Sequence, residues 1–236
     1  MAEPHHWNQS VLLKGLRPVD AAHLEQALQA LVAHHDALRL AFTRENDAWT
    51  ARHQSLAEQQ GLWQRSPLLW TAEVADAAAL ERLAEQAQRS LELQNGALLR
   101  GVLASLADGS QRLLLVIHHL VVDGVSWRIL LEDLQQAYQQ LQAGQALKLP
   151  AKTSATQAWA QRLQGHAGSA ALQAQIAYWQ GQLQDARADL PCDRPEGELR
   201  RCHGAQVQTR LDKKTRPDNS CSKRRRPTEP RSTICC

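Results

Sequence analysis

Residues 117–134, IHHLVVDGVSWRILLEDL, decide the fold expected of this chain. The apolar run LLLVI leads into this stretch and ends abruptly at two histidines, His118 and His119. A short apolar step and an Asp-Gly pair follow, and an amphipathic segment then leaves from Ser126. This order predicts a buried strand, a tight loop and an outgoing helix. The strand therefore delivers two imidazoles to its end, close in sequence to Asp123.

The histidine pair is the strongest candidate for chemistry. Imidazole is the side chain best suited to moving protons near neutral pH, and Asp123 could orient it or neutralise a nearby cation. A zinc site made by His118, His119 and Asp123 is a weak interpretation, because adjacent residues at a strand end point to opposite faces. We therefore expect no metal here. Ser126 just precedes the expected helix and is interpreted as its N-cap, not as a nucleophile.

The composition is that of an ordinary globular protein. Of the 236 residues 43% are hydrophobic, which is enough for a core in one domain or two small lobes. No apolar run approaches the ~18 residues of a membrane span. The N-terminal segment MAEPHHWNQS lacks the layout of a signal peptide. We expect a soluble, cytoplasmic protein with no membrane partner.

The net charge of +3 comes from the C-terminal end of the chain. Residues 213–236 hold eight Lys or Arg and two Asp or Glu, so the remainder has 19 basic and 22 acidic residues, a net of −3. Nucleic-acid binding needs a basic face on the folded body, and we expect no such partner. All five cysteines lie at or beyond Cys192 without Cys-x-x-Cys spacing, which argues against a disulfide framework and against zinc.

The sequence changes character from about Arg216, where Arg, Pro, Ser and Cys replace the Leu, Gln and Ala of the preceding chain. One interpretation is a disordered basic tail that binds an anion. The other, which we favour, is a lost reading frame. Codons compatible with residues 218–236, read from the third base of the first codon, permit the amphipathic string QQLLQAPPAYRTQVNDLL. The nucleotide sequence of the gene distinguishes the two.

Apolar periodicity and turn residues predict the elements around the motif. The clearest helix covers 76–93, with Asp76 as its N-cap, and an Asp-Gly turn joins strands at 98–106 and 112–118. The second of these strands is apolar throughout, which is typical when both faces are covered. Further strands are predicted at 6–14, 37–43, 49–51, 68–74 and 205–211, and further helices at 20–34, 156–166 and 170–183.

HHLVVDG at 118–124 fits the pattern HHxxxDG, the signature of the condensation-domain superfamily of nonribosomal peptide synthetases. HHDALRL at 34–40 resembles the family's early motif, after its first helix. AYWQGQL at 177–183, followed by LPCDRP, resembles its crossover to a second lobe. The resemblance covers about residues 4–215. Within the superfamily, PHHWNQSVLL, DGVSWRILLEDL and TSATQAWAQRL look most like epimerization domains.

The resemblance implies an α/β fold, an α+β two-layer sandwich of the chloramphenicol-acetyltransferase type. Residues 1–150 would form the N-terminal lobe of a condensation or epimerization domain. Residues 151–215 would form the crossover helices and the start of the second lobe, and 216–236 the frameshifted or disordered tail. Two such lobes form a V, and a tunnel between them admits the 4'-phosphopantetheine arms of carrier proteins. The motif would face this tunnel.

The resemblance also implies roles for the motif residues. His119 would be the catalytic histidine, and His118 would support it. Asp123 would be mainly structural and often pairs with an Arg, while Gly124 would keep the tunnel floor open. Ser126 and Trp127 are candidates for lining the substrate tunnel. No cofactor is expected to bind directly, since carrier-protein domains and adjacent synthetase modules would present the substrate.

Several functions fit this resemblance. An epimerization domain would use His119 to remove and return the Cα proton of a carrier-bound aminoacyl or peptidyl thioester, and this is our leading hypothesis. A condensation domain would use it to position or deprotonate the attacking amine. A truncated remnant could at most dock a carrier protein, and a basic-tailed binding protein ranks last. Epimerization relatives carry a glutamate in the second lobe that has no place in this sequence, so we expect the isolated chain to be inactive and to aggregate.

Overall fold

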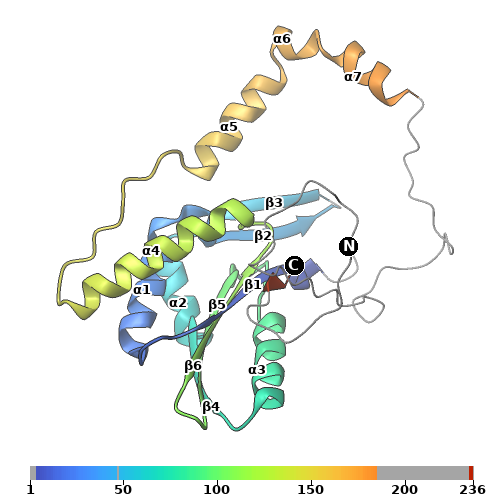
Figure 1. The fold of residues 1–236 in the computed structure, drawn as a ribbon. Helices are drawn as coiled ribbons and strands as arrows, with labels where there is room; N and C mark the ends of the chain where they lie inside the picture. Colours follow the sequence, from blue (N-terminus) through green and yellow to red (C-terminus); the bar gives the residue numbers. More distant parts are fainter. Residues whose placement is uncertain (1–3, 47, 185–233, 236) are drawn as a thin grey trace, which may run out of the picture.

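The structure is a computed structural model and describes residues 4–46, 48–184 and 234–235. A five-stranded sheet in the order β4-β5-β6-β1-β7 forms its centre (Figure 1). Strands β4 and β5 are parallel, and the other neighbours in the sheet are antiparallel. The strands are β1 Asn8–Lys14, β4 Leu69–Val74, β5 Leu99–Leu106, β6 Gln111–His118 and β7 Ile234–Cys235.

One face of the sheet is covered by α1 (Ala21–His34) and α4 (Gly124–Gln142), which pack on each other. Leucines of both helices meet alternate residues of β5 and β6 in the main apolar core. The approach of α1 to the sheet is close at Gly101, where a Cβ would lie 2.8 Å from Cδ1 of Leu28. A larger residue there would therefore require the Leu28 side chain to shift.

The opposite face of the sheet carries α3 (Ala77–Arg89). Ala87 of this helix and Leu91 just beyond it pack against Val102, Leu114 and Val116, the residues of β5 and β6 that point away from α1. Both faces of the central strands are thus covered, as the apolar sequence of β6 predicts. The fold class is α/β as expected, and α3 adds a partial third layer to the two layers predicted.

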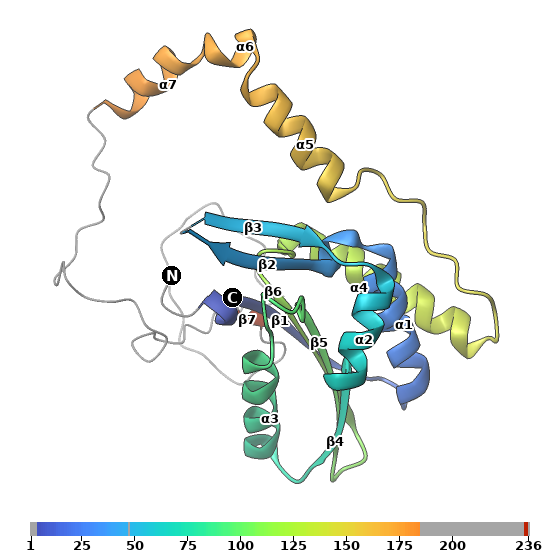
Figure 2. The same cartoon turned by 180° about the vertical axis from the view of Figure 1, so that it is seen from behind.

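Smaller elements surround one end of the sheet (Figure 2). Strands β2 and β3 form a separate antiparallel hairpin, tied to the body where the Phe42 N–H donates to the Leu93 carbonyl at 2.8 Å. Helix α2 begins after Ser55, which forms a reciprocal capping box with Glu58. The bounds are β2 Leu40–Glu45, β3 Ala48–His53, α2 Leu56–Arg65, and the 3-10 helices η1 Pro4–His6 and η2 Asp36–Arg39.

Three helices follow the body along an extended connection and lie away from the sheet (Figure 1). They are α5 Thr156–Ala167, α6 Ala170–Gln173 and α7 Ile176–Leu183. None of them contains a buried residue, and large apolar side chains such as Trp159, Tyr178 and Trp179 are more than half exposed. Their helical periodicity is therefore not matched by a packing partner within the described residues.

Most predicted elements are present, with four corrections. The strand predicted at 37–43 is wrong in its first half, because residues 36–39 form η2. The helix predicted at 76–93 ends at Arg89, because the Ser90 side chain and N–H both bond back to the Ala87 carbonyl. The helix predicted at 170–183 breaks into α6 and α7, and the first strand begins at Asn8 rather than at residue 6.

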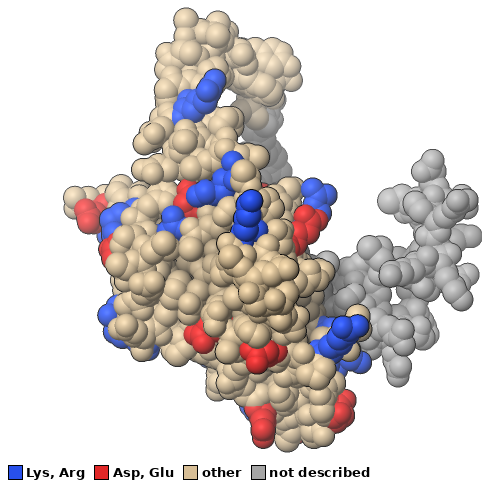
Figure 3. All heavy atoms as spheres, turned by 90° about the vertical axis from the view of Figure 1, so that its left-hand side faces the viewer, with Lys and Arg blue, Asp and Glu red and all other residues tan. Residues whose placement is uncertain are grey.

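Part of the chain for which the sequence makes predictions lies outside the described residues. This holds for the strand predicted at 205–211, for the LPCDRP segment and for all of the 216–236 tail except β7. None of the described helices combines the length and the apolar character needed to cross a membrane. On the face drawn in Figure 3, acidic and basic side chains are interspersed rather than gathered by sign.

Candidate active site

The end of β6 places its two histidines in opposite environments. β1 pairs with β6 so that Asn8 lies opposite His118, and the next pair continues the ladder with the His119 N–H donating to the Trp7 carbonyl at 2.7 Å. His118 is 1% exposed, and its Nδ1 accepts from the Leu120 N–H at 3.2 Å. His119 is exposed. Of the two imidazoles, only that of His119 is open to a substrate.

His119 is held by a side chain that the sequence patterns did not single out. The Gln9 amide nitrogen lies 2.9 Å from His119 Nε2, and the Gln9 amide oxygen accepts from the Trp127 indole N–H at 2.8 Å. Gln9 sits on β1 and Trp127 on the first turn of α4, so two rigid elements fix the amide. The alternation of side chains along β1 was the sequence signal that could have identified Gln9 as a site residue. It puts Gln9 on the α4 side of the sheet once the pairing of β1 with β6 is known.

Asp123 caps the helix that leaves the motif. Its carboxylate accepts from the Ser126 hydroxyl at 2.6 Å and from the Ser126 N–H at 2.7 Å. These hydrogen bonds hold the pKa of the Asp123 carboxyl below its usual range, and the proximity of His119 adds to the effect. The N-cap of α4 is therefore Asp123, and the prediction that Ser126 caps this helix is wrong. Ser126 lies in the first turn and its hydroxyl is used by the cap.

The remaining motif positions fit an open surface. Gly124 begins α4 with no atom within 4 Å of where a Cβ would lie, so this side of the loop is empty. Exposed apolar side chains follow His119 in the sequence, precede β1 and occupy the start of α4: Leu120 54%, Trp7 54%, Val125 66% and Ile129 45%. Among the described residues, no arginine forms an ion pair with Asp123, unlike the pairing that the resemblance implies.

A second histidine cluster lies between α1 and α4. Ligand atoms of His34, His35 and Asp133 all fall within 4.8 Å of one another. His35 Nε2 is 2.7 Å from Asp133 Oδ2, a hydrogen-bond distance, whereas two donors on one zinc ion lie roughly 3.3 Å apart at ordinary bond lengths. Burial and the neighbouring His35 lower the pKa of His34, which keeps that ring neutral. The cluster ties the two helices together, and His35 is the C-cap of α1.

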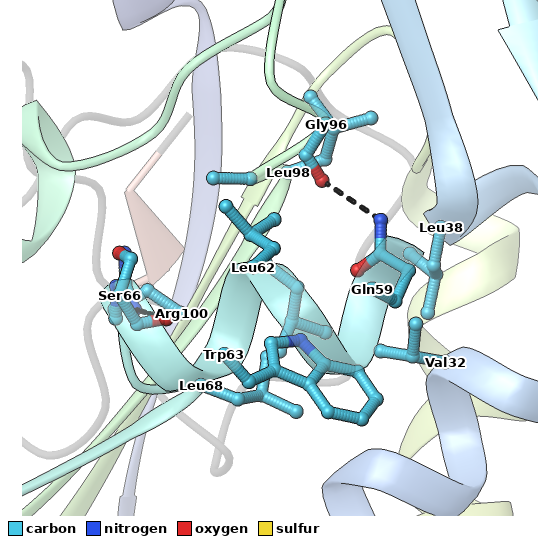
Figure 4. Close-up of a pocket in the computed structure, with 12 residues that line it drawn as sticks. Val32, Leu38, Gln59, Leu62, Trp63, Ser66, Leu68, Gly96, Leu98 and Arg100 are labelled. Atoms are coloured by element: carbon cyan, nitrogen blue, oxygen red, sulfur yellow. Dashed lines mark hydrogen bonds between the residues drawn. The ribbon is translucent and has the colours of Figure 1, made fainter. Parts of the chain in front are cut away.

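The cavity drawn in Figure 4 is separate from the motif. It lies between α2 and β5 and encloses about 10 Å³, room for about one water molecule. Gln59, Leu62 and Trp63 of α2 line it together with Arg100 of β5 and with Leu98, which directly precedes β5. A space of this size does not admit a substrate, so the exposed strand end at His119 is the candidate active site.

Comparison with known proteins identifies the family to which this chain belongs. The family model of the condensation domain matches residues 1–219. A linear gramicidin synthase of Brevibacillus parabrevis is 45% identical over 191 residues, which are 80% of this chain and 2% of that protein. Surfactin synthase subunit 1 of Bacillus subtilis (strain 168) is 42% identical over 213 residues, 88% of this chain and 6% of that protein. The chain thus spans a small fraction of these curated relatives.

Two solved structures show the same fold. The epimerization domain from the third module of tyrocidine synthetase B superposes with a TM-score of 0.70 and 36% identity, covering 80% of this chain and 42% of that one. The first condensation domain of the calcium-dependent antibiotic synthetase gives a TM-score of 0.62 and 22% identity, covering 79% and 44%. The strand that ends in HHxxxDG and the helix that the motif aspartate caps point to the same family as these matches. The chain belongs to the condensation-domain family of nonribosomal peptide synthetases.

Proposed function

We propose that this chain is part of an epimerization domain, which inverts the Cα of an aminoacyl or peptidyl group held as a thioester on the 4'-phosphopantetheine of a carrier protein. The observation that carries the proposal is the 36% identity over 80% of the chain to a solved epimerization domain. A condensation domain of the same fold is 22% identical over a similar length. Carrier-protein domains and neighbouring synthetase modules would be the partners.

His119 is the group proposed to move the proton. The Cα–H of a thioester is a weak acid, so its removal needs a positioned base and stabilisation of the enolate oxygen. The C–H bond breaks, its electron pair moves toward the thioester oxygen, and His119 takes the proton. Return of a proton to the opposite face of Cα inverts the centre. The exposed ring of His119 and the apolar side chains near it support this role.

Inversion needs groups on both faces of the Cα, and the described residues supply one imidazole. Asp123 is committed to Ser126, so its place is in the helix cap and not in proton transfer. The resemblance implies that relatives use a glutamate of the second lobe as a further acid or base. We therefore expect the 236-residue chain on its own to give no turnover.

A chimaera tests the proposal. In it, residues 4–184 of this chain would replace the corresponding segment of the tyrocidine synthetase B epimerization domain. With an L-aminoacyl carrier protein in D₂O, we expect deuterium incorporation at Cα and appearance of the D-aminoacyl thioester. A chimaera that melts cooperatively, gives no exchange and instead forms a peptide bond with an upstream peptidyl carrier would identify a condensation domain.

A further inference from the structure

The side chains of Trp127, Gln9 and His119 form a chain of hydrogen bonds whose direction is fixed at one end. An indole Nε1–H can only donate, so the atom of the Gln9 amide that lies 2.8 Å from it must be the oxygen. The amide NH₂ therefore points the other way, to His119 Nε2 at 2.9 Å. Without Trp127 the two ends of the amide could exchange, and the direction would be undetermined.

The fixed amide in turn determines the state of the histidine. An NH₂ group can only donate, so the ring nitrogen facing it must offer a lone pair. A neutral imidazole carries one proton, which must then lie on Nδ1. We propose that Gln9, oriented by Trp127, is a positioning residue that holds His119 as the neutral ring with its proton on Nδ1 and its lone pair on Nε2.

This arrangement has a consequence for proton transfer that rests on the proposed function. Nε2 carries the lone pair that can accept a proton, and the hydrogen bond from the Gln9 NH₂ to this lone pair must break when the proton arrives. Once Nε2 is protonated it faces the Gln9 NH₂, and two donors repel. The imidazolium must then turn away from Gln9 or give the proton up. Gln9 thus favours the basic form of the ring before the reaction and release of the proton after it.

One charged group interacts with His119 electrostatically, the Asp123 carboxylate. Its Oδ1 accepts both hydrogen bonds from Ser126, and among the described residues the Gln9 amide is the side chain within hydrogen-bond distance of Nε2. The tautomer is therefore set by a hydrogen bond, and substitutions at Gln9 should move it.

The test is a nitrogen NMR measurement on the full chain, and it needs no substrate. Histidine is labelled with ¹⁵N, and the His119 ring is assigned by the signals lost in His119→Gln. Two-bond couplings to the ring protons identify each nitrogen. In the unsubstituted chain at a pH where the ring is neutral, we expect Nε2 at the shift of an unprotonated nitrogen and Nδ1 at that of a protonated one. The reverse assignment overturns the proposal by itself.

Three substitutions extend the test. Gln9→Glu keeps the length and the Trp127 bond but turns the donor into an acceptor, so we expect the ratio of Nε2–H to Nδ1–H to rise at least about tenfold. Gln9→Met removes both bonds, and the ratio should rise about fivefold. Trp127→Phe lets the amide flip and should give a smaller rise. A folded Gln9→Glu chain with an unchanged ratio contradicts the proposal.

Gln88 provides the matched control for added charge. It contacts Ser10 and Asn8 on the other face of β1, so Gln88→Glu adds the same charge nearby without touching His119. The ratio should stay unchanged. An equal shift in Gln88→Glu would show that charge alone moves the proton, against the proposal. Should Gln9→Glu fail to fold, the unsubstituted chain and Gln9→Met still decide. The readout is also independent of turnover, so a chimaera without epimerization leaves this result standing.

Discussion

The two faces of the sheet give polar side chains different environments where β6 ends. On the α3 face, His118 is 1% exposed, and Arg100 is equally buried among hydroxyl and carbonyl oxygens. On the α1 and α4 face, the core is mainly leucine, and the polar side chains Gln9 and His119 lie at the end of their strands, where the sheet meets solvent. Two adjacent residues of the same type can therefore have different roles, one structural and one chemical, because their side chains point to different faces of the sheet.

Arg100 shows how the α3 face holds a cation without a carboxylate contact. Its guanidinium donates to the Ser66 hydroxyl at 2.7 Å, to the Ser90 hydroxyl at 3.0 Å and to the Pro67 carbonyl, and it lies 4.8 Å from the Trp70 ring centroid. Burial lowers the pKa of Arg100 to about 10. Fixed dipoles and an aromatic ring replace water around the charge.

The largest effect should come from the exposed histidine. In the chimaera, His119→Ala should lower the rate of Cα exchange by about 10²- to 10⁴-fold, the usual contribution of a general acid or base. The melting temperature should stay within the error of the measurement, because the ring is exposed. His166→Ala, at another exposed histidine, is the control and should keep the full rate. Near-normal exchange in His119→Ala would remove this residue from the mechanism.

The buried cation should have the next largest effect, on stability. Arg100→Met leaves two hydroxyls and a carbonyl without their donor, and we expect the free energy of unfolding to fall by about 3 kcal/mol. Urea denaturation measures it. Arg89→Met is the matched control, because Arg89 is exposed and, among the residues that the structure describes, forms its ion pair with Glu85 one turn earlier on α3. Its loss should be at most about 0.5 kcal/mol. Equal losses of unfolding free energy in the two variants would mean that the buried Arg100 on the α3 face contributes no more to stability than an exposed arginine.

The buried histidine should affect stability less than Arg100 and chemistry hardly at all. His118→Ala opens a space under the strand end and removes the acceptor of the Leu120 N–H, which together should cost about 2 kcal/mol. The per-molecule exchange rate of the folded chimaera should change much less than in His119→Ala. If folded His118→Ala loses as much exchange rate as His119→Ala, then His118 is not a purely structural residue, and the two faces of the sheet do not separate structural from chemical roles.

The helix cap should give the smallest change. Asp123→Ala should cost about 1 kcal/mol, while Asp123→Asn, an equally good N-cap, should cost little. The pKa of Asp123 is lower in the folded chain, so its ionic contribution is complete above the ordinary aspartate pKa and is lost as the pH falls below it. Chemical denaturation at neutral pH and at about pH 3 should therefore show a smaller difference in the free energy of unfolding between wild type and Asp123→Ala in acid. A difference in unfolding free energy that is the same at both pH values would contradict the role of the ionised Asp123 carboxylate in the helix cap.

Long regular segments could be predicted from the sequence, and local hydrogen bonds at their ends could not. The strands of the β5–β6 hairpin and helices α1 and α4 follow clear apolar periods. The segment 37–43 alternates like a strand, but Arg39 donates to the carbonyls of Val32 and Ala33 at the end of α1 and pulls residues 36–39 into η2. Leu91 continues the helical spacing of α3 by coincidence, since it packs beyond the helix end.

The candidate site was predictable in its motif and not in its supporting contacts. HHLVVDG identifies the strand end and the turn by spacing alone. Which residue caps α4 depends on whether Asp123 or Ser126 accepts the first free N–H groups, and both are good caps in sequence. Gln9 belongs to the site only because β1 lies beside β6, a pairing that joins segments far apart in the chain.

That distance has a consequence for folding. The hydrogen bond between Gln9 and His119 joins residues 110 positions apart, whereas β5 and β6 are connected by a short turn. Contacts between distant residues need a larger loss of chain entropy and form late. We therefore expect His119 to reach its final environment only when β1 docks, after the hairpin that carries it. The reactive end of β6 would then become ordered after the β5–β6 hairpin has formed, and a partly folded chain would expose His119 without its contact to Gln9.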